Sequence, residues 1–225
     1  MVTVNYKTEH LLRAAVESFR AFYPAVPMVV LDNGSADGST EYVSRIGVTD
    51  KLATVVLNEE NQGHGPALHH CIANLVQTPY VLTFDSDCKV VRGGFIEQML
   101  SAFQADEKLY AIGWLRYVNV DGVAFEWHVP PPETKAQFCP YVHPSCGLYA
   151  RDKYMALRNG FIDHGAPAVN NMRDAMAAGY HLQDFPVAAF VEHWVAGTRR
   201  MFGGHWHPSG GAKPQPWNAR QTFPI

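Results

Sequence analysis

The amino-acid sequence predicts an α/β protein whose mainly parallel central sheet is flanked by helices. Two observations carry this prediction. Short, almost wholly apolar segments alternate with segments of helical periodicity through roughly the first hundred residues, which is the pattern of a parallel sheet covered on both faces. Polar residues also collect directly after three of these apolar segments. Because ligands of open α/β sheets bind at the carboxyl ends of the strands, these residues are expected to share one crevice.

The first part of the chain is expected to alternate strands and helices. The strands are expected at about 2–5, 27–31, 53–57 and 80–84, each nearly all apolar. Thr8 is expected to cap the first helix, which ends before Pro24. A short helix follows Ser39, and a longer one spans about 66–76, where a proline suits the first turn.

After Leu100 the pattern changes. Asp121-Gly122 is typical of a hairpin turn between loosely alternating segments. Consecutive prolines then open an irregular stretch, and the glycines and prolines of the tail predict irregular structure there as well. The expected elements are hairpin strands at 109–118 and 123–129, an irregular stretch at 130–146, helices near 151–158 and 168–178, a strand at 187–193 and an irregular tail at 201–225.

Composition bounds the class of protein. One large domain is a simpler interpretation of 225 residues than two small ones, with 1–105, 106–200 and 201–225 as its parts. A net charge of -3 supplies no basic field, which disfavours nucleic-acid binding. No apolar stretch approaches the length of a membrane span and no basic leader precedes the first strand, so a cytoplasmic protein without a transmembrane segment is expected.

The four cysteines lack the paired spacing of a zinc site. We expect thiols, although Cys139 and Cys146 are close enough in sequence to leave a disulfide open.

Asp85-Ser86-Asp87 directly follows an apolar strand, so two carboxylates are expected to project from one rigid edge. Hard divalent cations such as Mn2+ and Mg2+ prefer oxygen ligands, and such a cation offsets the charge of a diphosphate. A polar turn is the alternative for these residues. Their place behind a buried strand favours the metal site.

Two further loops carry polar residues. Asp32, at the end of the second strand, could accept an N–H group of a nucleobase, although a helix-entry turn explains the run Asp32 to Ser39 equally well. The segment Asn61 to Gly65 places two glycines beside a helix N-terminus, where backbone amides and the helix dipole favour a phosphate.

Taken in order, these motifs resemble the family 2 glycosyltransferases, which have the GT-A fold, a Rossmann-like three-layer sandwich. The resemblance covers residues 1 to 105 best and rests on Val4-Asn5-Tyr6, Asp32-Asn33-Gly34-Ser35, Asn61-x-Gly63-His64-Gly65 and Asp85-Ser86-Asp87. It implies inverting transfer of a sugar from a UDP-, GDP- or dTDP-sugar, UDP being favoured, to a hydroxyl of a glycan, lipid or small molecule. Asp32 would contact the nucleobase, Asp85 would lie near the ribose, and Asp87 would bind Mn2+ or Mg2+. The implied nucleotide-binding set is Val4, Asn5, Tyr6, Asp32, Asn61, Gly63, His64, Asp85 and Ser86.

The second half departs from the family pattern. Pro144 to Tyr149 resembles the small-residue acceptor loop, but the acidic pair expected before Gly179-Tyr180 falls on Ala166-Pro167-Ala168. Since inverting transfer needs a group to take the acceptor proton, Asp163 and then His164 are the candidate bases. Either could instead be an ordinary loop residue.

Two groups of histidines remain. His193 stands where the family often has a histidine for the metal or diphosphate, and a buried structural histidine is the alternative. His205-Trp206-His207 could form a second metal-binding group or a lid, or simply belong to a tail packed on the surface.

Two other functions stay open. A nucleotidyltransferase of similar fold also needs carboxylates and a metal, but the first strand is not followed by a glycine-rich basic loop. The missing acidic pair fits a non-catalytic nucleotide-sugar-binding protein.

Overall fold

The computed structural model describes residues 1–119, 125–126, 138–161 and 167–194. Its main sheet has the strand order β3-β2-β1-β4-β8-β6-β7, with β9 paired to β6. Four of the seven pairings are parallel and three are antiparallel, which confirms a mainly parallel sheet. The strands are β1 (Val2–Asn5), β2 (Met28–Asn33), β3 (Ala53–Asn58), β4 (Tyr80–Phe84), β6 (Leu109–Asn119), β7 (Phe125–Glu126), β8 (Phe138–Ala150) and β9 (His181–Asp184).

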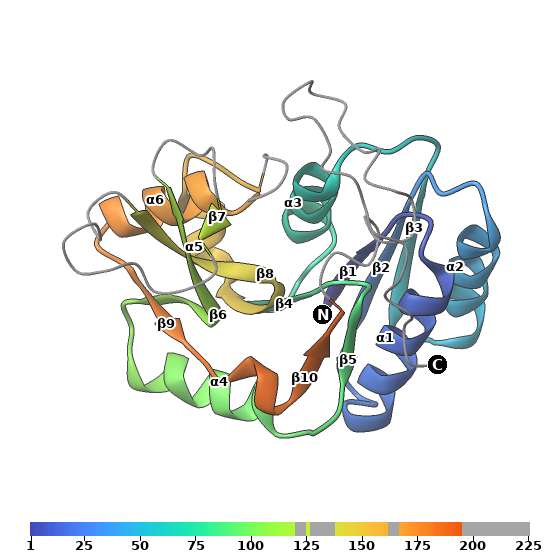
Figure 1. Ribbon diagram of the computed structural model, residues 1–225, viewed down its shortest axis with the longest axis horizontal. Coiled ribbons are helices and arrows are strands. Elements are labelled where there is room, and N and C mark those ends of the chain that lie inside the picture. Colours follow the sequence, from blue (N-terminus) through green and yellow to red (C-terminus); the bar gives the residue numbers. More distant parts are fainter. Residues whose placement is uncertain (120–124, 127–137, 162–166, 195–225) are drawn as a thin grey trace.

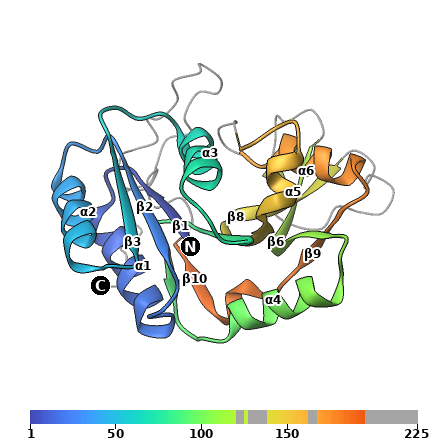
Figure 2. The ribbon, with the colours of Figure 1, turned by 180° about the vertical axis from the view of Figure 1, so that it is seen from behind.

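Helices cover both faces of this sheet, giving the predicted three layers (Figures 1 and 2). One face packs on α1 (Glu9–Phe22), α2 (Gly38–Thr49) and α4 (Phe95–Ala105). The other packs on α3 (His64–Asn74), α5 (Arg151–Ala156) and α6 (Val169–Ala177). No helix within the described residues combines the length and apolar character needed to cross a bilayer.

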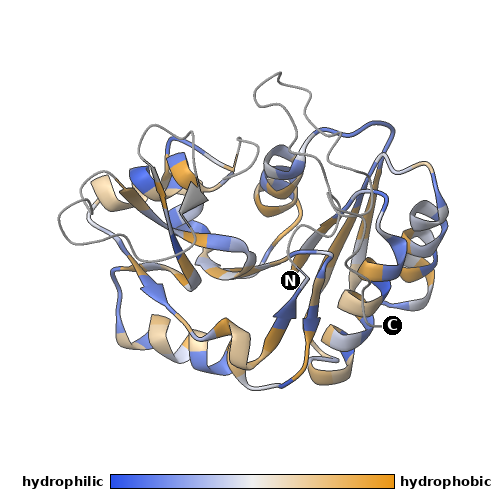
Figure 3. Ribbon diagram, viewed as in Figure 1, coloured by the Kyte–Doolittle hydropathy of each residue, from blue (hydrophilic) through white to orange (hydrophobic). Residues whose placement is uncertain are grey.

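The sheet separates two apolar clusters because successive side chains of a strand point to opposite faces. In β2, Val30 belongs to the cluster under α1, whereas Val29 and Leu31 belong to the cluster under α3. Every residue of β2 is buried, which explains the unbroken apolar run from Met28 to Leu31. The apolar residues accordingly follow the central strands in Figure 3.

The first half matches the expected elements closely. β1 and β4 have the predicted limits, and β2 and β3 differ from theirs by one or two residues. Pro66 lies in the first turn of α3, as predicted. The helix α4 was not predicted, although Phe95, Ile96, Met99 and Phe103 give it a buried apolar face. All four cysteines are buried thiols, which confirms that prediction and removes the Cys139–Cys146 disulfide.

The second half differs more. The prediction of an irregular stretch at 130–146 is wrong for residues 138–146, which belong to the long strand β8. β8 is held on both sides, by β4 and by β6, so pairing with distant segments overrides its prolines. The predicted hairpin is found only where β7 pairs with the end of β6, since 120–124 and 127–137 lie outside the described residues.

The last elements also depart from expectation. The strand predicted at 187–193 is a 3-10 helix at Val187–Ala189 followed by β10 (Val191–His193). β10 pairs with β5 (Cys88–Val90) in a separate antiparallel sheet. This pairing matters for the site because it sets His193 opposite Cys88, directly after Asp87.

Candidate functional site

The loops after β1, β2 and β4 meet at the carboxyl edge of the sheet. Asn5 and Asp32 are neighbours in the β1–β2 register, and the Asn5 amide donates to Asp32 Oδ1 at 3.1 Å. The Thr8 hydroxyl donates to Asn5 Oδ1 at 2.7 Å and lies 3.2 Å from the Ser86 hydroxyl. Three sequence-predicted site residues, Asn5, Asp32 and Ser86, are therefore joined through one buried network.

Asp32 is buried and receives hydrogen bonds from several donors. Besides Asn5, its carboxylate accepts from the Thr40 hydroxyl at 2.8 Å, from the Ser35 amide at 3.4 Å and from the Ser35 hydroxyl. A carboxylate offers about four acceptor positions, so these donors fill it. An N–H group of a ligand would have to share or replace one of the hydroxyl donors. Thr40 and Ser35 were not predicted as site residues.

Asn33 ties the second loop to the third. Its amide donates to Asn61 Oδ1 at 2.9 Å, and its Oδ1 accepts from the Gln62 backbone amide at 3.1 Å. Asn61 Oδ1 also accepts from the Gly63 backbone amide at 2.8 Å, directly before α3 begins. Gly34 has φ +73°, and a Cβ there would lie 2.6 Å from the Glu60 backbone. The two loops are thus packed without room for a side chain between them.

His64 faces the first aspartate of the Asp85-Ser86-Asp87 segment. Its Nε2 lies 3.4 Å from Asp85 Oδ1. Burial disfavours both charged forms, but the mutual attraction outweighs it: the pKa of Asp85 is lowered, by His64 above all, and the pKa of His64 is raised, by Asp85 above all. The sequence placed both residues in the site, and the structure brings them together.

Asp87 faces His193. Asp87 Oδ1 lies 3.2 Å from His193 Nε2, and one ligand atom each of Asp87, Cys88 and His193 lies within 4.8 Å of the others. Burial lowers the pKa of His193, but the hydrogen bond and charge of Asp87 outweigh this and raise it. Asp87 and His193, the two residues predicted to bind the metal, therefore lie next to each other.

The residues present fit a hard divalent cation better than a soft one. Burial raises the pKa of the Cys88 thiol well above its usual value, and its Sγ donates to the Ser145 carbonyl at 3.3 Å. Beside this thiol, Asp87 offers a carboxylate oxygen and His193 an imidazole nitrogen as ligands. Oxygen and nitrogen ligands suit Mn2+, and carboxylate oxygens suit Mg2+.

Three residues beside this pair were not predicted. The Trp114 ring lies edge-on to His193 with centroids 5.9 Å apart, and the Arg116 guanidinium stacks 3.6 Å from the Trp114 ring centroid. The ring of His143 lies 5.8 Å from that of His193. Trp114 lies at an irregularity of the β6–β8 pairing, between Gly113 and Leu115. The sequence marks this place only by a tryptophan and an arginine two residues apart on a strand, which is a weak signal.

His143 is a poor candidate for a proton acceptor. Its Nδ1 accepts from the Ser145 backbone amide at 3.1 Å and lies 2.8 Å from the Ser145 hydroxyl. Burial lowers the pKa of His143 to about 3. Its ring nitrogen lone pair is therefore already occupied.

The remaining predicted residues divide into two groups. Val4 is buried in β1 and Tyr6 is half-buried just after it, beside the loops described above.

Asp163 and His164 lie outside the described residues, so their candidacy stays a prediction. α6 begins at Val169 behind Ala168 and has no acidic residue in its first turn. The helix that would follow the family's acidic pair thus starts without one.

Comparison with known proteins identifies a matching family. The family model described as glycosyl transferase family 2 matches residues 1–161. Comparison with curated proteins gives no significant match.

Solved structures share the fold at low sequence identity. A mannosyltransferase from Pyrobaculum calidifontis, in complex with GDP-Man and Mn2+, is 18% identical with a TM-score of 0.67, over 89% of this chain and 58% of that one. GalNAc-T7 with UDP, GalNAc and Mn2+ is 14% identical with a TM-score of 0.68, over 85% and 42%. A TarS fragment from S. aureus is 15% identical with a TM-score of 0.54, over 84% and 58%. The chain thus spans about half the length of these structures, and the likeness confirms the GT-A fold.

Proposed function

The chain belongs to glycosyl transferase family 2, and on that premise we propose that it transfers a sugar from a nucleoside-diphosphate sugar to an acceptor hydroxyl with inversion. UDP is the favoured nucleotide. One observation carries the proposal: the loops after β1, β2 and β4 meet at one edge of the sheet, where Asp87 also faces His193. The nucleobase, ribose and diphosphate of such a donor, and the cation, each need polar groups to bind them at this edge.

The nucleoside end of the donor would lie along the loops after β1 and β2. Asp32 would accept an N–H of the base by replacing one hydroxyl donor, with Val4, Asn5 and Tyr6 beside it. Asp85 would bind the ribose hydroxyls, and Ser86 would help to fix that loop through Thr8.

The phosphates would lie near the start of α3. Asn61 fixes the Gly63 backbone at the N-terminus of that helix, where free amides and the helix dipole favour anions. His64, whose pKa Asp85 raises against the effect of burial, lies at the same end. The diphosphate would therefore meet donors on one side and the cation on the other.

Asp87 and His193 would hold Mn2+ or Mg2+. Such a cation, when bound, offsets the negative charge that develops on a departing diphosphate. Asp87 contributes the carboxylate, and β10 fixes His193 against it through its pairing with β5. The mannosyltransferase and GalNAc-T7 structures each contain Mn2+ together with a nucleotide or nucleotide sugar, which supports this role.

The acceptor proton would pass to Asp163, or failing that to His164. An inverting displacement needs a base opposite the leaving group, and the start of α6 offers no carboxylate. His143 is already committed to Ser145. The same missing carboxylate favours a second candidate function, a nucleotide-sugar-binding protein without turnover.

A ligand screen followed by a hydrolysis assay tests both candidates. Thermal unfolding would be followed with UDP-, GDP- and dTDP-sugars in Mn2+, in Mg2+ and in chelator, since a ligand of the native state raises the apparent Tm. We expect a UDP-sugar with Mn2+ to give the largest shift and slow donor hydrolysis to follow. A shift without hydrolysis above background would select the binding protein. No shift with any donor would remove the proposal.

A further inference from the structure

His143 lies where the pairing of β6 with β8 is interrupted. The register shifts at Trp114, which alone faces the four residues 143–146 of β8. Bulges of this kind turn side chains out of the regular alternation of a strand and often lie beside active sites. His143 is only half-buried, although residues 141–142 and 144–150 on either side of it are buried. The bulge therefore leaves one polar side chain of a buried strand accessible.

The accessible ring lies among the groups of the candidate site. Its centroid is 5.8 Å from that of His193 and 6.5 Å from that of Trp114. Burial lowers the pKa of His143, and among the neighbouring charges that of Asp85 acts on it most strongly. His143 is thus a neighbour of both Asp85 and His193.

The backbone of Ser145 fixes the tautomer of His143. The Ser145 amide donates to His143 Nδ1 at 3.1 Å, so this nitrogen carries no proton. In a neutral imidazole the proton is then on Nε2. An imidazolium has an N–H group at both nitrogens and would lose the bond from the amide. His143 is therefore held as a neutral ring whose Nε2 is a hydrogen-bond donor.

Ser145 also holds the Asp85-Ser86-Asp87 loop. Its carbonyl accepts from the Asp85 amide at 2.9 Å and from Cys88 Sγ at 3.3 Å. The residue is fully buried, and its hydroxyl lies 2.8 Å from His143 Nδ1. One backbone unit therefore fixes both the loop and the orientation of the imidazole beside it.

The order of the strands indicates which part of a donor His143 would face. Asp32 ends β2, Asp85 and Asp87 follow β4, and β8 is the next strand of the order β2-β1-β4-β8. Because β8 runs antiparallel to β4 and Phe84 pairs with Cys146, His143 lies beyond the carboxyl end of β4. A donor with its nucleobase at Asp32 and its diphosphate at the cation would continue in this direction with its sugar.

We propose that His143 Nε2 donates a hydrogen bond to a hydroxyl oxygen of the transferred sugar, with the Ser145 amide fixing the tautomer that does so. This inference rests on the proposed function. A hydroxyl oxygen is uncharged and accepts a hydrogen bond from a neutral N–H group. His143 would therefore distinguish a hydroxylated sugar from one without that hydroxyl.

Two substitutions separate the N–H group from the ring. His143→Gln keeps an N–H donor at the reach of Nε2, whereas His143→Phe keeps a ring without one. Calorimetry in Mn2+ would compare UDP with UDP-glucose and GDP with GDP-mannose. His143→Phe should weaken binding of the nucleotide sugar about tenfold and leave binding of the nucleotide unchanged. His143→Gln should stay within about threefold of wild type for both.

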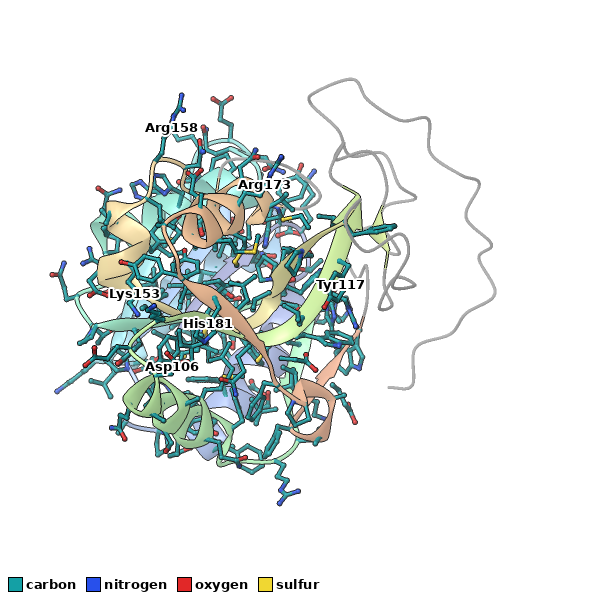
Figure 4. The ribbon with its side chains drawn as sticks, turned by 90° about the vertical axis from the view of Figure 1, so that its left-hand side faces the viewer. Asp106, Tyr117, Lys153, Arg158, Arg173 and His181 are labelled. Atoms are coloured by element: carbon teal, nitrogen blue, oxygen red, sulfur yellow. The ribbon has the colours of Figure 1, made fainter. Side chains whose placement is uncertain are left out.

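His181→Phe is the matched control. His181 also contacts a carboxylate, since its Nε2 lies 2.6 Å from Asp106 Oδ2, but it pairs with Leu109 at the start of β6. Figure 4 shows His181 close to Asp106 and Lys153 and apart from Tyr117, which lies further along β6. This variant should bind nucleotides and nucleotide sugars as the wild type does.

Deoxygenated donors identify the hydroxyl through a double-mutant cycle. Each sugar hydroxyl would be removed in turn from whichever of UDP-glucose and GDP-mannose binds more tightly. The wild type should bind one derivative about tenfold more weakly than the parent, whereas His143→Phe should bind the two alike. Equal losses in the wild type and in His143→Phe for every derivative would overturn the proposal.

Nitrogen NMR of protein with isotope-labelled histidines tests the tautomer without any ligand. The His143 signals are those missing from the spectrum of His143→Gln. At neutral pH they should show Nδ1 without a proton and Nε2 with one. A proton on Nδ1 would overturn the proposal, because Nδ1 could then not accept from the Ser145 amide.

The binding data distinguish failure of this inference from failure of the proposed function. Unchanged affinity of His143→Phe for the nucleotide sugars overturns the inference and leaves the proposed function standing. So does an equal loss for nucleotide and nucleotide sugar, or a loss in His143→Gln as large as that in His143→Phe. A wild type that binds none of the four ligands in Mn2+ removes the proposed function, and this inference with it.

Discussion

Residues 1–105 and 106–194 contribute to the same sheet but are built in different ways. In the first part, neighbouring parallel strands are joined by helices that pack on them, and the site residues bond mainly to one another. In the second part, two long antiparallel strands, β6 and β8, pair with each other and with β4. The first part holds a preassembled polar network, whereas the second brings single side chains to it from distant places in the sequence.

The difference suggests that the two parts have different roles, one in donor binding and the other in turnover. Substitutions in the first part should damage donor binding, and substitutions at the acceptor side should damage turnover while sparing donor binding. His193 is the exception, because β10 returns from the end of the described chain to complete a pair with Asp87. The predictions below test this division, beginning with the largest expected effect.

Asp163→Asn should lower kcat about a hundredfold or more, because it removes the proposed base with little change of shape. UDP affinity should stay unchanged, since the nucleotide would bind at the other half. Steady-state kinetics and calorimetry with UDP give the two quantities. His164→Ala is the parallel variant for the second candidate.

Asp152→Asn, an exposed position at the start of α5, is the matched control and should keep normal turnover. If Asp163→Asn and His164→Ala both keep near-normal turnover, neither residue is the base. If either one abolishes UDP binding, the division between the two halves fails.

Gly34→Ala should destabilise the first half specifically. The residue has φ +73°, and the new methyl group would meet the Glu60 backbone, so we expect a loss of about 3 kcal/mol in the free energy of unfolding. UDP binding should weaken as well, because the clash separates the loops that carry Asp32 and Asn61. Urea denaturation and calorimetry measure both effects.

Gly179→Ala separates backbone strain from the clash. Gly179 has φ +84°, with nothing within 4 Å of a Cβ, so this variant should lose only about 1 kcal/mol. It should bind UDP normally. Equal losses in the two variants would show that the close approach of the two loops contributes nothing.

The sequence predicted the two parts to different extents, for physical reasons. Apolar runs such as Val29 to Leu31 are sufficient to identify strands buried on both faces, and helix signals lie within a few residues of each helix. β8 could not be found in this way because Pro140 and Pro144 argue against a strand, and only pairing with β4 and β6 stabilises it. β9 is a short strand of largely exposed residues and gives almost no signal.

The residues of the site were also predictable from the sequence to different extents. Asp32, Asn61, Asp85 and Asp87 lie at strand ends or within three residues after them, so their positions were predictable from the sequence. The contacts of Trp114 and His143 with His193 depend on the irregularity in β6 and on the return of β10. No local sequence pattern predicts contacts between residues this far apart in the chain.

A smaller effect of pH should appear in the first half. Asp85 raises the pKa of His64 above 6.5, so the stability from this pair is complete below about pH 6.5 and is lost as pH rises through the raised value. His64 lowers the pKa of Asp85 below 3.8. The stability that the ionised Asp85 contributes is therefore present above about pH 4 and is lost on further acidification. The pair should therefore contribute most between about pH 4 and 6.5.

His64→Gln removes this contribution. Since both side chains are partly exposed, we expect only about 0.5 kcal/mol. Urea denaturation should show that wild type loses this much more stability than the variant between about pH 6 and 8.5. His70→Gln, an exposed histidine on the same helix, is the control. Parallel pH profiles for wild type and His64→Gln would show that the pair contributes no stability.

The central claim is that Asp87, assembled with His193, binds the cation that donor binding requires. Calorimetry of UDP binding in Mn2+ and in chelator tests it most directly, for wild type, Asp87→Asn and the exposed control Glu192→Gln. Wild type and Glu192→Gln should bind UDP about tenfold or more tightly in Mn2+, because an uncompensated diphosphate would face Asp85 and Asp87. Asp87→Asn should lose that difference. Equal UDP affinity of the wild type in Mn2+ and in chelator would contradict the account.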